Sequence, residues 1–230
     1  PGDEVIVQPL TYCGTCDHCL NGMENYCSEM GILGKTVNGT QCEYVLFKSY
    51  QLRKKPAHLS FPDAAAFSLV TQTAYAMLVK RAKIKPGETV FIWGAGSGVG
   101  SMAIQIAHYF GCTVYAAAGT DEKVNMAIKL GAEKAWNYKN TDIGLEVKEN
   151  AGRHGVDVVF EHVGPQTWDI SKKMLATGGR LVTCGATTGS DVSIDLRHLF
   201  MKQQSILGST MSDVQTFDDM LSLINGNVIH

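Results

Sequence analysis

The fold is decided by the stretch Val90-Phe91-Ile92-Trp93-Gly94-Ala95-Gly96-Ser97-Gly98-Val99-Gly100. It reads as a short apolar strand, a glycine-dense turn and the beginning of a helix. Glycines let the backbone bend sharply and approach a diphosphate, whose charge is met by free amides at the helix N-terminus. The strict G-x-G-x-x-G spacing fails, because the sixth position counted from Gly94 is Val99. A tight turn with a purely structural role is therefore the alternative interpretation.

From this stretch onward the chain alternates strands with helices. The expected strands are 90–93, 112–118, 156–160, 180–184 and 205–207, and the expected helices are 98–110, 121–130, 165–175 and 213–224. Apolar strands that are separated by helices indicate a parallel sheet buried on both faces. The fold class is therefore α/β, with a doubly wound sheet of the Rossmann type. Upstream, we expect two short strands at 4–8 and 43–48 and an alanine-rich helix over 63–83.

Four of the seven cysteines lie within fifteen residues, namely Cys13, Cys16, Cys19 and Cys27. Tetrahedral zinc needs four soft ligands at about 2.3 Å, and short spacings let one segment wrap the ion. Because thiolates would fill all four positions, none stays open for water or substrate, so such a zinc would be structural. An iron–sulfur cluster or a redox pair of thiols is the alternative from spacing alone. His18, inside this loop, is expected to be an exposed polar residue.

Composition excludes several classes of partner. The chain is 45% hydrophobic and 18% charged, with a net charge of −2. Nucleic acid and anionic membrane surfaces need a concentrated positive field, so neither is an expected partner. No apolar run approaches the ~20 residues that span a bilayer, and residues 1–4 lack a secretion signal. Since the cysteines cluster rather than spread into a disulfide framework, we expect a cytoplasmic protein.

The end of the second strand addresses the adenosine ribose of a bound dinucleotide. A carboxylate there bonds the 2′-hydroxyl of NAD and would repel the additional phosphate of NADP. This chain has no carboxylate at that strand end, and Thr120 and Lys123 are placed to meet a phosphate. Asp121 and Glu122 are expected in the first turn of the next helix, where negative charge is favourable. NADP(H) is therefore the preferred cofactor. In the alternative, the cofactor is NAD(H) and Lys123 is a solvated helix residue.

With both sites in view, the chain resembles the medium-chain dehydrogenase/reductase superfamily, which includes zinc alcohol dehydrogenases and quinone oxidoreductases. The resemblance covers residues 1–5, the four cysteines, 73–75, the glycine turn, 129–132, 161–164 and 178–182. It implies a GroES-like, β-rich catalytic domain packed on a Rossmann domain. Residues 1–72, with the zinc lobe at 13–27, would be the C-terminal part of the first domain, and 73–230 the NAD(P)-binding domain. Both chain ends are expected to be cut from a longer polypeptide that carries further catalytic residues.

The resemblance also implies the residues that hold the cofactor. Thr73 should approach the nicotinamide. The diphosphate turn would comprise Gly94, Gly96, Ser97, Gly98, Val99 and Gly100, and the cleft after successive strands would be lined by Val163, Gly185, Ala186, Gly208, Ser209 and Thr210. A small-molecule substrate and a homo-oligomer, either a dimer or a tetramer, are further implications.

Leu69 departs from the family's pattern. Zinc alcohol dehydrogenases place a Cys or Asp ligand of the catalytic zinc four residues before the Thr that matches Thr73, and leucine has no lone pair. Members without catalytic zinc typically reduce enones, quinones or enoyl thioesters, in which hydride reaches a carbon made electrophilic by conjugation. We therefore expect hydride transfer from NADPH to an activated alkene or quinone. The alternatives are a zinc-dependent alcohol dehydrogenase and a non-catalytic nucleotide-binding protein.

No catalytic residue is assigned from the sequence. His162 follows a buried strand, and it is open to acid–base catalysis or to a hydrogen bond with the cofactor or the backbone. Cys184 is expected to be a small buried side chain rather than a nucleophile, because no base is adjacent to it.

Overall fold

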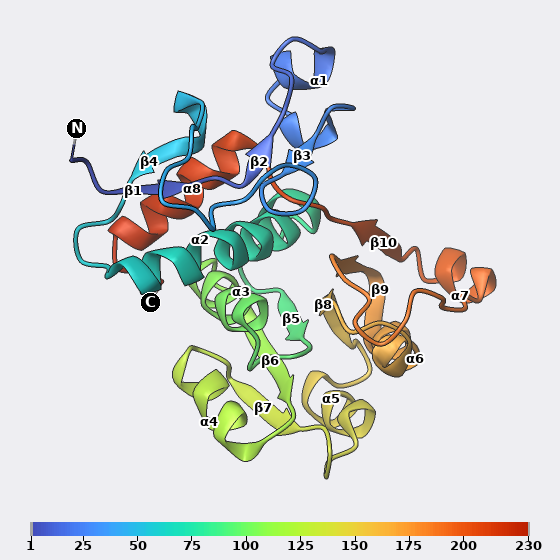
Figure 1. Cartoon of the computed structure of the whole chain (residues 1–230). Helices are drawn as coiled ribbons and strands as arrows, with labels where there is room; N and C mark the ends of the chain where they lie inside the picture. Colours follow the sequence, from blue (N-terminus) through green and yellow to red (C-terminus); the bar gives the residue numbers. More distant parts are fainter. Residues whose placement is uncertain (1, 230) are drawn as a thin grey trace. The chain divides into compact units, whose positions relative to one another are not determined.

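A computed structural model describes residues 2–229. The chain divides into two compact units (Figure 1): Pro1–Thr73 with Thr210–His230, and Ala74–Ser209. The last helix, α8 (Val214–Asn225), thus groups with the first unit. The assignment of 73–230 to one nucleotide-binding domain stays a prediction about the whole polypeptide. Among the described helices, none combines the length and the apolarity that a membrane span requires.

The second unit contains a six-stranded sheet in which every neighbouring pair is parallel. The strands are β5 (Thr89–Ile92), β6 (Thr113–Ala118), β7 (Lys134–Asn137), β8 (Val156–Glu161), β9 (Leu175–Thr183) and β10 (Ser205–Gly208). Their order across the sheet is β10-β9-β8-β5-β6-β7. This confirms the expected α/β fold.

The strand order places a switch point between β5 and β8. From β5 the chain winds outward through β6 to β7, then returns to β8 on the other side of β5 and winds outward to β10. In open parallel sheets, ligands bind beyond the carboxyl ends of the strands at such a point. Here those ends are Trp93-Gly94 after β5 and Glu161-His162 at β8.

Helices cover the sheet and explain why its central strands β5, β6 and β8 are largely apolar and buried. The helices of this unit are α3 (Gly98–Tyr109), α4 (Asp121–Lys129), α5 (Ile143–Ala151), α6 (Pro165–Met174), α7 (Leu196–Met201) and the π-helical turn η3 (Ala76–Arg81). Phe91, Trp93 and Val159 of the sheet share one buried cluster with Val147 of α5 and Trp168 of α6. Helix α3 contacts β5 and β6, and α4 contacts β6 and β7.

The first unit combines short strands and helical turns with two longer helices, α2 (Phe61–Tyr75) and α8. Its elements are β1 (Val5–Val7), β2 (Leu10–Thr11), α1 (Asp17–Leu20), η1 (Glu24–Tyr26), β3 (Gly31–Ile32), η2 (Ser49–Gln51), β4 (Leu52–Lys54), α2 and α8. Strand β1 pairs with β4, and β2 pairs with β3, both antiparallel.

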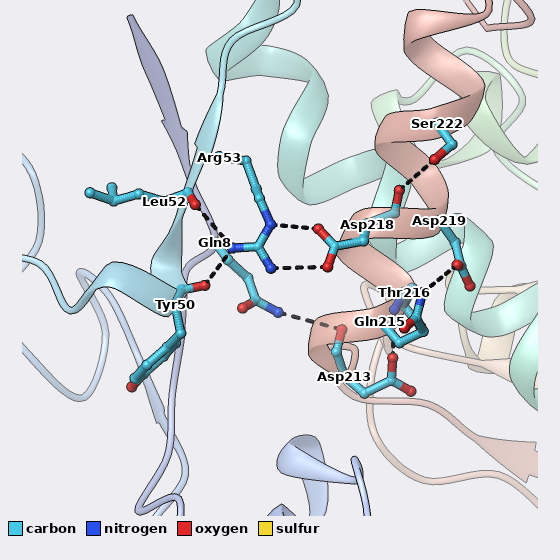
Figure 2. A network of polar contacts seen from close by, with 10 residues as sticks. All are labelled: Gln8, Tyr50, Leu52, Arg53, Asp213, Gln215, Thr216, Asp218, Asp219 and Ser222. Carbon is cyan, nitrogen blue, oxygen red and sulfur yellow. Dashed lines mark hydrogen bonds and ion pairs between the residues drawn. The ribbon is translucent and has the colours of Figure 1, made fainter. Parts of the chain in front are cut away.

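Arg53 ties α8 to the strands of the first unit, as Figure 2 shows. Its guanidinium spans both oxygens of the Asp218 carboxylate, with Nη2 donating to Oδ2 over 2.9 Å. Nη1 donates to the carbonyl oxygens of Tyr50 and Leu52 at 3.0 and 2.9 Å. This planar fork gives the contact a defined geometry, because guanidinium matches carboxylate in a bidentate arrangement.

Several expected elements differ from the structure. The expected strand at 43–48 is wrong: the segment is irregular, with Tyr44 at 93% and Leu46 at 97% exposure. Within residues 2–229 no strand pairs with this segment, so its alternating pattern has no ladder to join. The helix expected at 63–83 ends as α2 and continues as the η3 π turn. Strand β7 and helices α5 and α7 were not anticipated.

Candidate dinucleotide and metal sites

The glycine-rich turn connects β5 to α3 and leaves amides available for an anion. Ser97 caps the helix, because its Oγ accepts a hydrogen bond of 3.0 Å from the amide of Gly100. The amides of Gly98 and Val99 open the helix and have no carbonyl one turn upstream to bond. Such amides, at the positive end of the helix dipole, suit a diphosphate.

Two glycines of the turn are required by sterics. Gly94 has a φ of +61°, and a Cβ there would lie 2.7 Å from Cε1 of His162. A Cβ at Gly100 would lie 2.9 Å from the carbonyl carbon of Gly94 and 3.1 Å from Cα of Ala95. The turn can therefore fold back on the helix only without side chains at these positions. Close packing of the turn against the helix is one of the reasons why a dinucleotide turn needs glycine.

The end of β6 offers polar groups without a carboxylate. Thr120 caps α4 by accepting a hydrogen bond of 3.3 Å from the amide of Lys123. Asp121 lies in the first turn of α4, as expected, and accepts a hydrogen bond of 2.7 Å from Asn137. The alkyl chain of Lys123 covers the turn, because a Cβ added at Gly96 would lie 2.7 Å from its Cγ.

Tyr138 borders the same position and was missed in the sequence analysis. Its hydroxyl would lie 2.6 Å from a Cβ added at Gly119, directly after β6. Tyr138 follows β7, so an analysis that had detected this edge strand could have found it. Lys123, Thr120 and Tyr138 thus lie near the end of β6.

His162 binds the backbone of the turn. Its Nε2 lies 3.0 Å from the carbonyl oxygen of Trp93, which can only accept, so Nε2 is the donor. The imidazole packs against Gly94. Of the roles open to His162, the structure therefore assigns the backbone hydrogen bond.

The other second-unit residues that are expected to line the cofactor cleft follow the ends of β8, β9 and β10. Val163 lies after β8, with its carbonyl oxygen bonded by the amide of Thr188 at 2.8 Å. Gly185 and Ala186 are exposed after β9. Gly208 ends β10, and the amide of Ser209 donates to the carbonyl of Thr183 at 2.9 Å. Burial raises the pKa of the Cys184 thiol, which argues against a nucleophile there.

Three of the expected residues belong to the first unit. Thr73 and Leu69 lie on α2, where the Thr73 hydroxyl donates to the Leu69 carbonyl at 2.8 Å. The Leu69 side chain is 44% exposed and has no atom that can bind a metal. Thr210 accepts a hydrogen bond of 3.4 Å from Asn25. The approach of Thr73 to the nicotinamide stays a prediction.

The four clustered cysteines converge in the first unit. Their Sγ atoms all lie within 4.8 Å of one another, with Cys16–Cys19 at 3.5 Å, Cys13–Cys27 at 3.6 Å and Cys13–Cys19 at 3.8 Å. A tetrahedron of zinc–sulfur bonds of about 2.3 Å has sulfur–sulfur edges of about 3.8 Å, whereas a disulfide is about 2.05 Å long. The donor set therefore fits one tetrahedral cation, and a multi-iron core would hold its ligand sulfurs farther apart.

Backbone amides prepare one of these thiols for a cation. The amides of Thr15 and Cys16 each donate to Cys13 Sγ at 3.4 Å. These hydrogen bonds lower the pKa of the Cys13 thiol to about 6. Burial raises the pKa of the Cys19 thiol to about 12, a shift that a bound divalent cation would oppose. His18 is exposed, as expected.

Two family models match the chain. Residues 98–226 match the zinc-binding dehydrogenase family, and residues 1–57 match the alcohol dehydrogenase GroES-like domain. The chain belongs to the zinc-binding dehydrogenases. This membership confirms the resemblance to the medium-chain dehydrogenase/reductase superfamily and the presence of GroES-like sequence before the Rossmann-type sheet.

Three relatives of this zinc-binding dehydrogenase illustrate the range of the family. Crotonyl-CoA reductase of Streptomyces avermitilis is 33% identical over 100% of this chain and 56% of the relative. The structure of an NAD-dependent alcohol dehydrogenase is 39% identical, with a TM-score of 0.95 over 100% of this chain and 67% of that one. A crotonyl-CoA carboxylase/reductase in complex with NADP is 26% identical, with a TM-score of 0.93 over 100% and 64%. The chain thus spans little more than half the length of the reductase from S. avermitilis.

Proposed function

We propose that the full-length protein is an oxidoreductase that transfers hydride from NADPH to an activated alkene or quinone, such as an enone or an enoyl thioester. The observation that carries the proposal is the glycine turn at the switch point of the parallel sheet, with its unpaired helix amides. The four cysteines would hold a zinc ion that braces the first unit and takes no part in the reaction.

The chain's own residues would divide the work of binding the cofactor. The amides of Gly98 and Val99 would hold the diphosphate, and Lys123, Thr120 and Tyr138 would meet the 2′-phosphate. The loops after β8 and β9 would orient the nicotinamide. When bound, the reduced nicotinamide supplies the hydride, and positioning contributes much of the rate.

Leu69 and the reductase relative favour an activated double bond as the substrate. Interconversion of alcohols and carbonyls in this family uses a catalytic zinc as Lewis acid, and Leu69 offers no ligand where such a zinc would be held. The similarity to crotonyl-CoA reductase supports an enoyl thioester. The complex of a crotonyl-CoA carboxylase/reductase with NADP supports NADPH over NADH.

An alcohol dehydrogenase is the second candidate, and its support is the 39% identity to a solved NAD-dependent alcohol dehydrogenase. Its catalytic zinc ligands would then be rearranged or lie outside these residues. For either function, we propose that the full-length protein is cytoplasmic, forms dimers or tetramers and acts on a small molecule.

Purified full-length protein should be assayed for NADPH oxidation with enones, quinones, enoyl thioesters, aldehydes and ketones, and its zinc content measured by mass spectrometry. The proposal predicts turnover with a conjugated substrate and one zinc per chain. Turnover only of the aldehydes and ketones, with two zinc ions per chain, would support the alcohol dehydrogenase. Binding of NADPH without turnover of any substrate would indicate a non-catalytic protein.

A further inference from the structure

Glu161 is a buried carboxylate at the end of β8, and it has no part in the cofactor contacts of the proposed function. Its side chain is 0% exposed. Oε1 accepts hydrogen bonds from the amides of Val163 and Gly164 at 2.6 and 3.1 Å. Oε2 accepts from the hydroxyls of Thr167 and Ser171 on α6, at 2.8 and 2.9 Å. Since a buried charge is costly unless it is fully hydrogen-bonded, this set of four donors indicates a dedicated arrangement.

The same network reaches the strand that precedes the glycine turn. Trp93 Nε1 donates to the Ser171 hydroxyl at 2.8 Å, and that hydroxyl donates onward to Glu161. His162, the next residue after Glu161, donates to the Trp93 carbonyl at 3.0 Å. Two separate hydrogen-bonded links therefore join the ends of β5 and β8 at the switch point.

The loop after β9 is attached to the segment that Glu161 holds. The Thr187 hydroxyl donates to the His162 carbonyl at 2.9 Å. The amide and the hydroxyl of Thr188 both lie 2.8 Å from the carbonyl oxygen of Val163 and donate to it. Residues 162–164 are thus held by the Glu161 carboxylate and by the hydroxyls and backbone of residues 187–188.

We propose that Glu161 is a positioning residue, whose carboxylate holds residues 162–164 in the geometry that hydride transfer needs. This inference rests on the proposed function. In the proposed function the diphosphate would bind the turn at 94–100, which contains none of the four donors to Glu161. Loss of the carboxylate should therefore disturb the nicotinamide end of the cofactor and leave its affinity largely intact.

The test is Glu161→Gln in the full-length enzyme. The amide keeps the size of the side chain, but its NH2 group is a donor and would face two existing donors. We expect kcat to fall roughly 10²-fold, as misplacement by about 1 Å can cause. The KM for NADPH should change less than about threefold. A lowered kcat with a nearly unchanged KM would show that the carboxylate contributes to hydride transfer rather than to cofactor binding. Glu161→Asp, which keeps the charge, should recover part of kcat.

Glu88→Gln is the matched control. Glu88 is also a poorly exposed carboxylate, but it pairs with Arg180 and directly precedes β5, at the opposite end from Gly94. This variant should lose stability without the loss of kcat. If Glu161→Gln retains the wild-type kcat, or if Glu88→Gln lowers kcat equally, the role of Glu161 is only structural and the inference is overturned.

Amide hydrogen exchange separates this inference from the proposed function. In Glu161→Gln without cofactor, exchange at Val163 and Gly164 should accelerate, while exchange at Gly100 should not. A wild-type enzyme that turns over no substrate would refute the proposed function, yet the exchange experiment would still test the role of the carboxylate. Should Glu161→Gln fail to fold, Thr167→Val removes one donor isosterically, and it should lower kcat and accelerate the same amides to a smaller extent. Unchanged exchange in both variants would overturn the inference.

Discussion

Gly100→Ala tests whether dinucleotide binding depends on the close contact between the backbone of Gly100 and the backbone of Gly94 and Ala95. The added Cβ would lie 2.9 Å from the carbonyl carbon of Gly94 and 3.1 Å from Cα of Ala95. Non-bonded carbons prefer about 3.5–4.0 Å, so the turn must yield by at least about 0.6 Å. The obstructing atoms are backbone, which cannot move by a change of rotamer.

Two effects oppose each other in the stability of this variant. Alanine in a helix is favoured over glycine by about 0.5–1 kcal/mol, whereas overpacking costs about 1–3 kcal/mol. We expect a net loss of about 1–2 kcal/mol from these terms. The effect on cofactor affinity should be larger, because a hydrogen bond to a charged group contributes about 1.5–3 kcal/mol. Loss of one such bond to the diphosphate raises the Kd for NADPH about tenfold to hundredfold.

The assay is calorimetric titration of the full-length protein with NADPH, alongside thermal unfolding. Gly144→Ala is the control, because Gly144 also lies in the first turn of a helix, α5, and its Cβ would meet only Asp142 and Ile170 at 3.4 and 3.9 Å. It should gain about 0.4–1 kcal/mol of stability and bind NADPH normally. Wild-type affinity in Gly100→Ala would refute the close-approach reasoning.

Three further predictions concern charge. Amide hydrogen bonds lower the pKa of Cys13 to about 6, so in zinc-free protein at pH 7 this thiol should be a thiolate and be alkylated rapidly. Burial raises the pKa of Cys112 to about 11, so this thiol should stay protonated and react slowly. Equal labelling of the two cysteines in peptide mass spectrometry would contradict this prediction. Glu88→Gln removes the charge and leaves one acceptor oxygen for the two Arg180 donors. It should lower the free energy of unfolding in urea by roughly 1–3 kcal/mol, reduced by the partial exposure of the pair. An unchanged midpoint would show that the pair contributes nothing. Lys123→Ala should raise the KM for NADPH about tenfold with little change for NADH; equal changes for both would remove Lys123 from the phosphate site.

The features that could be predicted from the sequence are those written in short stretches of chain. The spacing of Cys13 to Cys27 brings four thiols within 4.8 Å of one another because they share a single loop. The turn after Trp93 was identified by glycine density between an apolar strand and a helix. Helix α5 could also have been found, because Asp142 caps it and Ile143 and Val147 are spaced by one turn.

What the sequence analysis missed depends on contacts between distant segments. The hydrogen-bonded link between Trp93 and Glu161 runs through Ser171, which bonds both side chains from a third element, α6. One signal existed, since a lone glutamate closing the apolar strand 156–161 is an unusual residue to bury without partners. The strand expected at 43–48 shows the converse error. Its local alternation of apolar and polar residues is typical of a strand, but no strand among the described residues pairs with it.

A crystal structure of the full-length protein, from crystals soaked with NADPH, is the strongest test of whether the turn after Trp93 binds a dinucleotide and the cysteine cluster binds zinc. We expect diphosphate density against the amides of Gly98 and Val99, with the adenosine phosphate near Lys123. Anomalous scattering should place a zinc ion within the cluster that contains Cys13. A dinucleotide bound elsewhere, or a side chain filling the bend after Trp93, would contradict the account.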